Sequence, residues 1–125
     1  RVKLRHIDEI TNERYVIGKR YLEGIKNSKI ILPKTLANVN HVYHQFVIRC
    51  KDRDMLHSFL EENGIQTQIH YPIPPHLAEC YRWQGYKEGD YPITEEYANT
   101  VLSLPIYTGM TKEEQDYVIE ILNKF

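Results

Sequence analysis

The sequence predicts one α+β domain, a two-layer sandwich in which helices pack on a small, mainly antiparallel sheet. Three stretches lead to this prediction: a long helical periodicity near the start, an alternating β-rich stretch in the middle, and a capped amphipathic stretch at the end. Helical and strand-like stretches alternate without repeats or linkers. The chain has 125 residues, of which 42% are apolar and 26% charged, and this composition suits a single globular domain.

The first expected element is one long helix over residues 2–27. Apolar residues recur there at spacings of three, four and seven, at Ile7, Ile10, Ile17, Tyr21 and Ile25. Arg14 occupies one position of this stripe, so the face there meets either solvent or a partner. The periodicity already runs at Arg1 without an initial methionine, so we expect a piece of a longer protein. Residues 30–33 are expected to lead into a polar loop.

The best strand signal lies in residues 41–50, which are rich in β-branched and aromatic types. Alternation places these residues on one face of the strand: Val42, His44, Phe46, Ile48 and Cys50. His44 is therefore expected to be buried and hydrogen-bonded to backbone. A helix should follow, with Asp52 as its N-cap and Asn63–Gly64 as its end, before a short strand over residues 65–69.

Residues 71–92 are rich in proline, glycine and tyrosine and are predicted as a long irregular segment with one helical turn. Such a segment inside a domain is usually functional. A helix should follow that is capped by Thr94 and ends at about Leu102, and then a short extended piece over residues 103–106. Thr111 and Glu114 form the capping-box pattern of the last helix.

Composition and charge exclude several classes of protein. The 16 basic and 17 acidic residues give a net charge of -1, which provides no long-range attraction for nucleic acid. No stretch approaches the roughly 20 apolar residues of a membrane span, so we expect neither a nucleic-acid nor a membrane partner. Cys50 and Cys80 are too few for a disulfide framework and are expected to be reduced thiols in the cytoplasm.

The candidate binding residues lie where the predicted strand ends and the proline-rich segment begins. His70 and Tyr71 would sit at the mouth of a cleft there, and their donors can bind phosphate or sugar hydroxyls. The alternative is that Tyr71 simply anchors the loop. His76 is a further candidate in the same segment.

No catalytic, metal-binding or cofactor-binding residue is predicted. His41 and His44 should point to opposite faces of a strand, and no zinc spacing links His70, His76 and Cys80. None of the nine lysines has a context typical of a desolvated Schiff-base amine.

Motifs spread over nearly the whole chain share their order with one known family. They are KLRHID at 3–8, HVYHQFVIR at 41–49, DRD at 52–54, NGI at 63–65, IHYPIPPH at 69–76 and LSLPIY at 102–107. In this order they resemble the carboxyl-terminal domain of the DegT/DnrJ/EryC1/StrS nucleotide-sugar aminotransferases. The proline-rich stretch, with GYKEGDYP at 85–92, is most similar to members that aminate dTDP-linked 3-keto-6-deoxyhexoses.

The resemblance implies that residues 1–125 are the small C-terminal domain of a fold-type I, pyridoxal-phosphate-dependent enzyme whose large, cofactor-binding domain lies outside this chain. The full-length enzyme would transfer an amino group from glutamate to a nucleotide-linked keto-sugar. It would act as a cytoplasmic homodimer in the synthesis of surface polysaccharides or glycosides. This chain alone is expected to hold no pyridoxal phosphate and to be inactive, since the cofactor chemistry needs the large domain.

In the family the His-Tyr-Pro loop lies over the cleft toward the substrate. The resemblance therefore implies substrate contacts for His70 and Tyr71. An alternative from another class is a stand-alone α+β module that binds a ligand or a protein partner without catalysis. In that case the tyrosine-rich segment would stack on a sugar or base, or the first helix would present its apolar residues to a protein.

Overall fold

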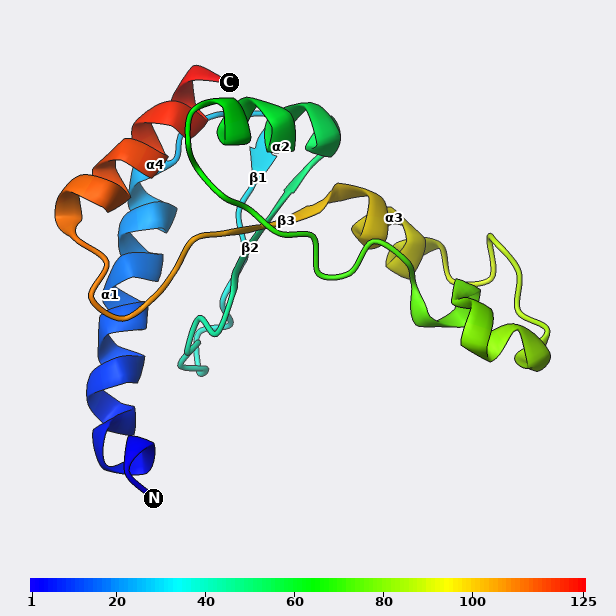
Figure 1. Cartoon of the computed structure of the whole chain (residues 1–125), viewed down its shortest axis with the longest axis horizontal. Coiled ribbons are helices and arrows are strands. Elements are labelled where there is room, and N and C mark those ends of the chain that lie inside the picture. Colours follow the sequence, from blue (N-terminus) through cyan, green and yellow to red (C-terminus); the bar gives the residue numbers. More distant parts are fainter.

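Three short strands form one antiparallel sheet in the computed structural model, which describes residues 1–125 (Figure 1). They are β1 (Ile30–Ile31), β2 (Phe46–Cys50) and β3 (Val101–Leu104), with β2 in the centre. In the register of this sheet, Ile30 lies opposite Cys50 and Phe46 opposite Leu104. The α+β prediction with an antiparallel sheet is confirmed.

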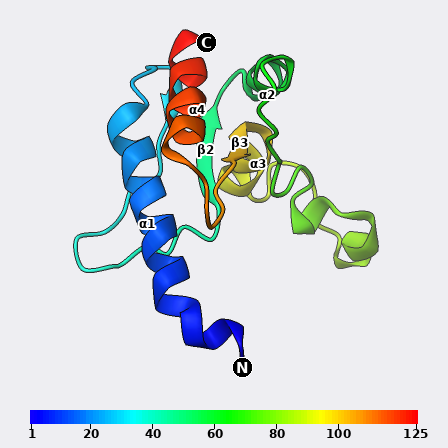
Figure 2. The ribbon, with the colours of Figure 1, turned by 60° about the vertical axis from the view of Figure 1, so that its left-hand side comes forward.

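Helices lie on both sides of the sheet. The four α-helices are α1 (Ile7–Gly24), α2 (Arg53–Glu62), α3 (Pro92–Thr100) and α4 (Lys112–Lys124), and short 3-10 helices form at Lys3–His6, Pro75–Leu77 and Glu79–Gln84. α1 and α4 lie side by side against one face of the sheet, and α3 lies on the other side (Figure 2). No helix combines the length and the hydrophobicity that crossing a bilayer requires.

The core forms where the inward face of β2 meets α1. Phe46, Ile48 and Cys50 alternate along β2 and are almost fully buried, as the sequence predicts. The rings of Phe46 and Tyr21 meet edge to face, with their centroids 5.1 Å apart. These residues belong to a cluster of 17 buried apolar residues that also includes residues of α2, β3 and α4. Burial of this apolar surface is the main force that holds the elements together.

The predicted first helix is confirmed over Ile7–Gly24, but residues 3–6 form a 3-10 turn and residues 25–27 lie outside the helix. Only the second half of α1 belongs to the core. Ile17 and Tyr21 are buried, whereas Ile7 is exposed and the N-terminal turns extend beyond the sheet (Figure 1). Arg14 meets a partner: its Nη1 donates to the carbonyl oxygens of Tyr43 and His44, at 3.1 and 3.0 Å. The apolar stripe of α1 is therefore interrupted at Arg14, where α1 is hydrogen-bonded to the loop before β2.

The loop before β2 corrects the strand prediction. The strand begins at Phe46 and not at residue 41, because Tyr43 adopts a positive φ of 43° and turns the chain. Tyr43 is buried against Gly18, where a Cβ would lie 2.6 Å from the tyrosine ring. The turn reverses the expected alternation. As a result, Val42 and His44 are exposed, and the prediction that His44 is buried is wrong.

The other boundaries differ by a few residues. The short pair Ile30–Ile31 forms β1, although only a lead into a loop was expected. α3 begins with Pro92 in its first turn rather than after Thr94. It ends at Thr100 instead of continuing through Leu102, so β3 is formed by residues 101–104 and not by residues 103–106. Residues 65–69 form a single bridge to β3, from Gln68 to Ser103, instead of a full strand. The capping box of Thr111 and Glu114 at the start of α4 is confirmed.

Candidate functional site

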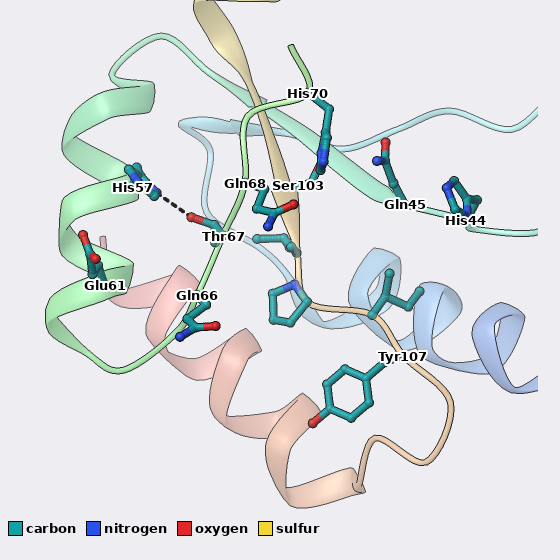
Figure 3. A pocket seen from close by; sticks show the side chains of 13 residues that line it. His44, Gln45, His57, Glu61, Gln66, Thr67, Gln68, His70, Ser103 and Tyr107 are labelled. Carbon is teal, nitrogen blue, oxygen red and sulfur yellow. Dashed lines mark hydrogen bonds between the residues drawn. The ribbon is translucent and has the colours of Figure 1, made fainter. Parts of the chain in front are cut away.

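A cavity of about 680 Å³ opens beside β3, at the side of the sheet that carries Ser103. Ser103 lies between the core residues Leu102 and Leu104, so alternation directs it away from the core. The walls come from the loop before β2, from α2, from residues 66–70 and from the chain after β3 (Figure 3). Residues 44–70 and residues 103–107 thus meet at one polar concavity.

The extended residues 65–70 bring polar side chains to this cavity. The cavity is lined by Gln66, Thr67, Gln68 and His70, while Ile65 belongs to the core. The backbone of Gln68 exchanges two hydrogen bonds with Ser103, at 2.8 and 3.2 Å. This bridge fixes the register of the segment on β3 and therefore the place of His70.

His70 and Tyr71, the predicted pair, occupy different surroundings. The Nδ1 atom of His70 lies 2.9 Å from the Oγ atom of Ser103, which is only 7% exposed. Tyr71 follows through a cis peptide bond, is 74% exposed and does not line the cavity. The two rings meet edge to face, with centroids 5.5 Å apart. Of the two, His70 is the residue that the fold holds at the cavity wall.

His76 lies away from this cavity, in the projecting segment, by which we mean residues 72–91 (Figure 1). Its side chain is 8% exposed and its Nε2 atom lies 3.0 Å from a carboxylate oxygen of Glu95. The same carboxylate accepts hydrogen bonds from the backbone N–H groups of Gly89 and Tyr91. The Gly89 N–H, followed by His76, holds the pKa of Glu95 below its ordinary value. The structure therefore joins His76 to Glu95, and its contact with a substrate stays a prediction.

Two further polar pairs at the cavity were not singled out from the sequence. His57 on α2 lies 2.7 Å from the hydroxyl of Thr67, and this contact is drawn in Figure 3. Tyr107 also lines the cavity, and the carboxylate of Glu114 beside it raises the pKa of its phenol. Alternation over residues 65–70 places Thr67 on the side opposite His70, and nothing in the sequence pairs α2 with this segment, so the contact between His57 and Thr67 is visible only in the structure.

The charge of the cavity wall suits a neutral polar ligand. Its lining residues include imidazole, amide, hydroxyl and phenol groups but no lysine or arginine, and Glu61 is the single acidic residue. Such groups recognise hydroxyl and carbonyl oxygens through hydrogen bonds. A strongly anionic group would find no fixed positive charge on this wall.

The residues of this chain do not fit a covalently held pyridoxal phosphate. All nine lysines are exposed, whereas a Schiff-base lysine is activated by a desolvated or electropositive pocket. We therefore assign no cofactor chemistry to the side chains described above.

Comparisons with known proteins place this geometry in context. A sequence model of the DegT/DnrJ/EryC1/StrS aminotransferase family matches residues 1–123. A dTDP-3-amino-3,6-dideoxy-alpha-D-galactopyranose transaminase from Aneurinibacillus thermoaerophilus is 42% identical, over 99% of this chain and 34% of its own length.

Two solved structures are similar to the chain as well. The first is DesV of S. venezuelae in complex with a ketimine intermediate, with a TM-score of 0.95 and 35% identity over 99% of this chain and 34% of DesV. The second is NtdA from Bacillus subtilis with bound cofactor PMP, with a TM-score of 0.77 and 31% identity over 90% of this chain and 27% of NtdA. The chain therefore spans about a third of the length of these relatives.

Proposed function

The chain belongs to the DegT/DnrJ/EryC1/StrS aminotransferase family, and from this premise we propose that it is part of an enzyme that aminates a nucleotide-linked keto-sugar. The observation that carries the proposal is the similarity, over nearly all of this chain, to a transaminase named for a dTDP-linked amino sugar. Glutamate is the proposed amino donor, pyridoxal phosphate the proposed cofactor, and surface polysaccharide or glycoside synthesis the proposed pathway class.

In this proposal residues 1–125 are the C-terminal small domain, and the domain that holds the cofactor lies elsewhere in the enzyme. Two observations support this arrangement. The relatives are about three times as long as the matched region, which covers 34% of them. In addition, Val2, Leu4 and Ile7 form an exposed apolar row at the start of the first helical stretch, and such a row is typical of a surface that another domain covers.

Within the small domain, we assign the sugar-facing role to His70 and Tyr71. His70 lines a cavity whose donors and acceptors suit the hydroxyl groups of a hexose. Tyr71 follows it with an exposed side chain. Hydrogen bonds from these side chains would orient the sugar for reaction in the cofactor-holding domain. His76 would contribute by holding the projecting segment through Glu95.

We further propose that the full-length enzyme is a homodimer in the cytoplasm. The two cysteines are unpaired, one buried and one exposed, which agrees with a reducing compartment. Light scattering of the full-length enzyme would measure its mass, and a monomer at working concentration would contradict the proposed dimer.

The test compares the two halves of amino transfer in the full-length enzyme. His70→Asn and Tyr71→Phe should each lower kcat/KM for a dTDP-linked keto-sugar by about 10-fold to 100-fold, because each variant loses a hydrogen bond to the sugar. The glutamate half-reaction should change little, since it does not involve the sugar.

His41→Asn provides a matched control, because His41 is an exposed histidine that does not line the cavity. Its Nδ1 accepts a hydrogen bond from the Tyr43 N–H, and the side-chain oxygen of asparagine can accept that bond in its place. This variant should leave both half-reactions unchanged. If His70→Asn lowered both half-reactions equally, the residue would support the cofactor or the fold, and the substrate role would be wrong.

A further inference from the structure

The contact between His70 and Ser103 determines which nitrogen of the imidazole faces the cavity. Nδ1 of His70 lies against the Ser103 hydroxyl, at 2.9 Å. Nε2, the other ring nitrogen, makes no hydrogen bond within the protein, although His70 lines the cavity. The ring is therefore held through Nδ1, and Nε2 is available to a ligand.

The direction of this hydrogen bond follows from the surroundings of Ser103. A serine hydroxyl has one proton to donate, and Ser103 lies in β3 with 7% of its surface exposed. The one hydrogen bond that this hydroxyl makes within the protein is to Nδ1 of His70. If Nδ1 carried the imidazole proton, the hydroxyl would have to donate to water in the cavity instead of to the protein. The arrangement in which Ser103 donates to an unprotonated Nδ1 satisfies both groups.

The same arrangement recurs on the opposite wall of the cavity (Figure 3). Nδ1 of His57 lies 2.7 Å from the hydroxyl of Thr67, which is also nearly buried and has no other hydrogen bond. Two imidazoles at one cavity are thus each hydrogen-bonded through Nδ1 to a nearly buried hydroxyl. This repetition indicates that each hydroxyl fixes the orientation of the histidine ring that it contacts.

We propose that Ser103 is the positioning residue of His70. Its hydroxyl donates to Nδ1, so the proton of the neutral imidazole stays on Nε2, and this N–H donates to a hydroxyl or carbonyl oxygen of the sugar in the cavity. In this form His70 is a hydrogen-bond donor and not a general base. The inference rests on the proposed function for the identity of the ligand, but the tautomer is a property of the protein alone.

The first measurement is the protonation pattern of the ring nitrogens, by nitrogen-15 NMR of the full-length enzyme labelled at histidine. The signals of His70 are those that disappear in His70→Asn. At a pH where the ring is neutral, the proposal expects a protonated Nε2 and an unprotonated Nδ1. Ser103→Ala should produce a mixture of both tautomers, whereas Ser103→Thr should keep the original pattern. A protonated Nδ1 in the unaltered enzyme, or no response to Ser103→Ala, would overturn the proposal.

The second measurement is kinetic and separates positioning from folding. Ser103→Ala should lower kcat/KM for the keto-sugar half-reaction by about 10-fold, and Ser103→Thr should restore most of it. In a His70→Asn background, Ser103→Ala should have no further effect, because the residue acts through His70. An equal loss in both backgrounds would show that Ser103 supports the fold only and would overturn the positioning role.

Ser28→Ala is the matched control, since Ser28 is exposed and lies in the turn after α1. It should change neither the tautomer nor the rate. The two proposals fail in distinguishable ways. If His70→Asn leaves sugar turnover intact, the substrate role fails, while the NMR pattern alone decides whether Ser103 fixes the tautomer.

Discussion

The sheet and the projecting segment of residues 72–91 are held by different forces. The sheet and its helices enclose a cluster of 17 buried apolar residues. The projecting segment buries only Pro74, and Trp83 within it is 79% exposed. Its order depends on edge-to-face aromatic pairs, such as Tyr86 with Tyr91, and on the carboxylate of Glu95. One region is thus stabilised by apolar burial and the other by a small number of polar and aromatic contacts.

This difference matters for function because the candidate residues His70 and His76 belong to different regions. His70 belongs to the sheet, since the Gln68–Ser103 bridge and the Ser103 hydroxyl both hold it. His76 belongs to the projecting segment, since Glu95 holds it. We therefore expect changes in one region to leave the other largely unaffected.

The largest expected effect is the loss of a core side chain. Leu102 is fully buried in β3, and Leu102→Ala should lower the free energy of unfolding by about 2–5 kcal/mol, because it removes buried apolar contacts and leaves a cavity. Chemical denaturation followed by circular dichroism measures this change.

Trp83→Ala provides the comparison from the other region. Because the indole is exposed, its loss should change the free energy of unfolding by no more than about 0.5 kcal/mol. Equal destabilisation by Leu102→Ala and Trp83→Ala would show that the projecting segment belongs to the same cooperative core, and the contrast between the two regions would fail.

A smaller, local effect is expected at Glu95. Glu95→Gln removes the charge that accepts hydrogen bonds from Gly89 and Tyr91, so these two amides should exchange with solvent faster. Amides of β2, such as that of Ile48, should keep their protection. Hydrogen exchange followed by NMR resolves both sets of amides.

The neighbouring residue on α3 offers a matched control. Glu96 is exposed and its carboxylate pairs with Arg49, not with the projecting segment. Glu96→Gln should leave the exchange of Gly89 unchanged. If both variants accelerated exchange at Gly89 equally, a general effect of charge on α3 would replace the specific role of Glu95.

The pH dependence of the projecting segment should be the weakest effect and follows from the same carboxylate. The pKa of Glu95 lies below its ordinary value of 4.5 in the folded chain, chiefly because of the Gly89 N–H. A carboxyl group with a depressed pKa stabilises the folded form above that ordinary value and loses this contribution as the pH falls through the depressed pKa. Protection of the Gly89 amide, corrected for intrinsic exchange, should therefore be constant above pH 4.5 and fall below it.

Glu95→Gln should abolish this dependence, because glutamine does not titrate. A loss of protection in acid that persists in Glu95→Gln would assign the pH effect to another group.

The sequence predicts the elements that follow from local patterns better than those that depend on distant contacts. The irregular segment over residues 71–92 with a short helical turn is confirmed. The alternation of Phe46, Ile48 and Cys50 and the capping box at Thr111 are local patterns, and both are confirmed. The start of β2 was predicted too early because the positive φ of Tyr43 depends on its packing against Gly18 in α1. That contact joins residues 25 positions apart, and a local pattern does not contain it.

The candidate site shows the same limit. The strand end before the proline-rich segment indicates His70, and the structure does bring His70 to a cavity. Its partner Ser103 is 33 residues away along the chain, and the Glu95 carboxylate that holds His76 is 19 residues from it. Only the fold shows that two histidines of one motif are held by different partners.

The most direct test of this account compares His70→Asn with His76→Asn in the full-length enzyme. Two quantities are measured for each variant: kcat/KM for the keto-sugar half-reaction and the exchange rate of the Gly89 amide. We predict that His70→Asn lowers kcat/KM by about 10-fold to 100-fold and leaves Gly89 protected. His76→Asn should instead speed the exchange of Gly89 and lower kcat/KM less. If His76→Asn lowered kcat/KM as much as His70→Asn while Gly89 stayed protected, His76 would be a sugar contact and the division between the two regions would be wrong.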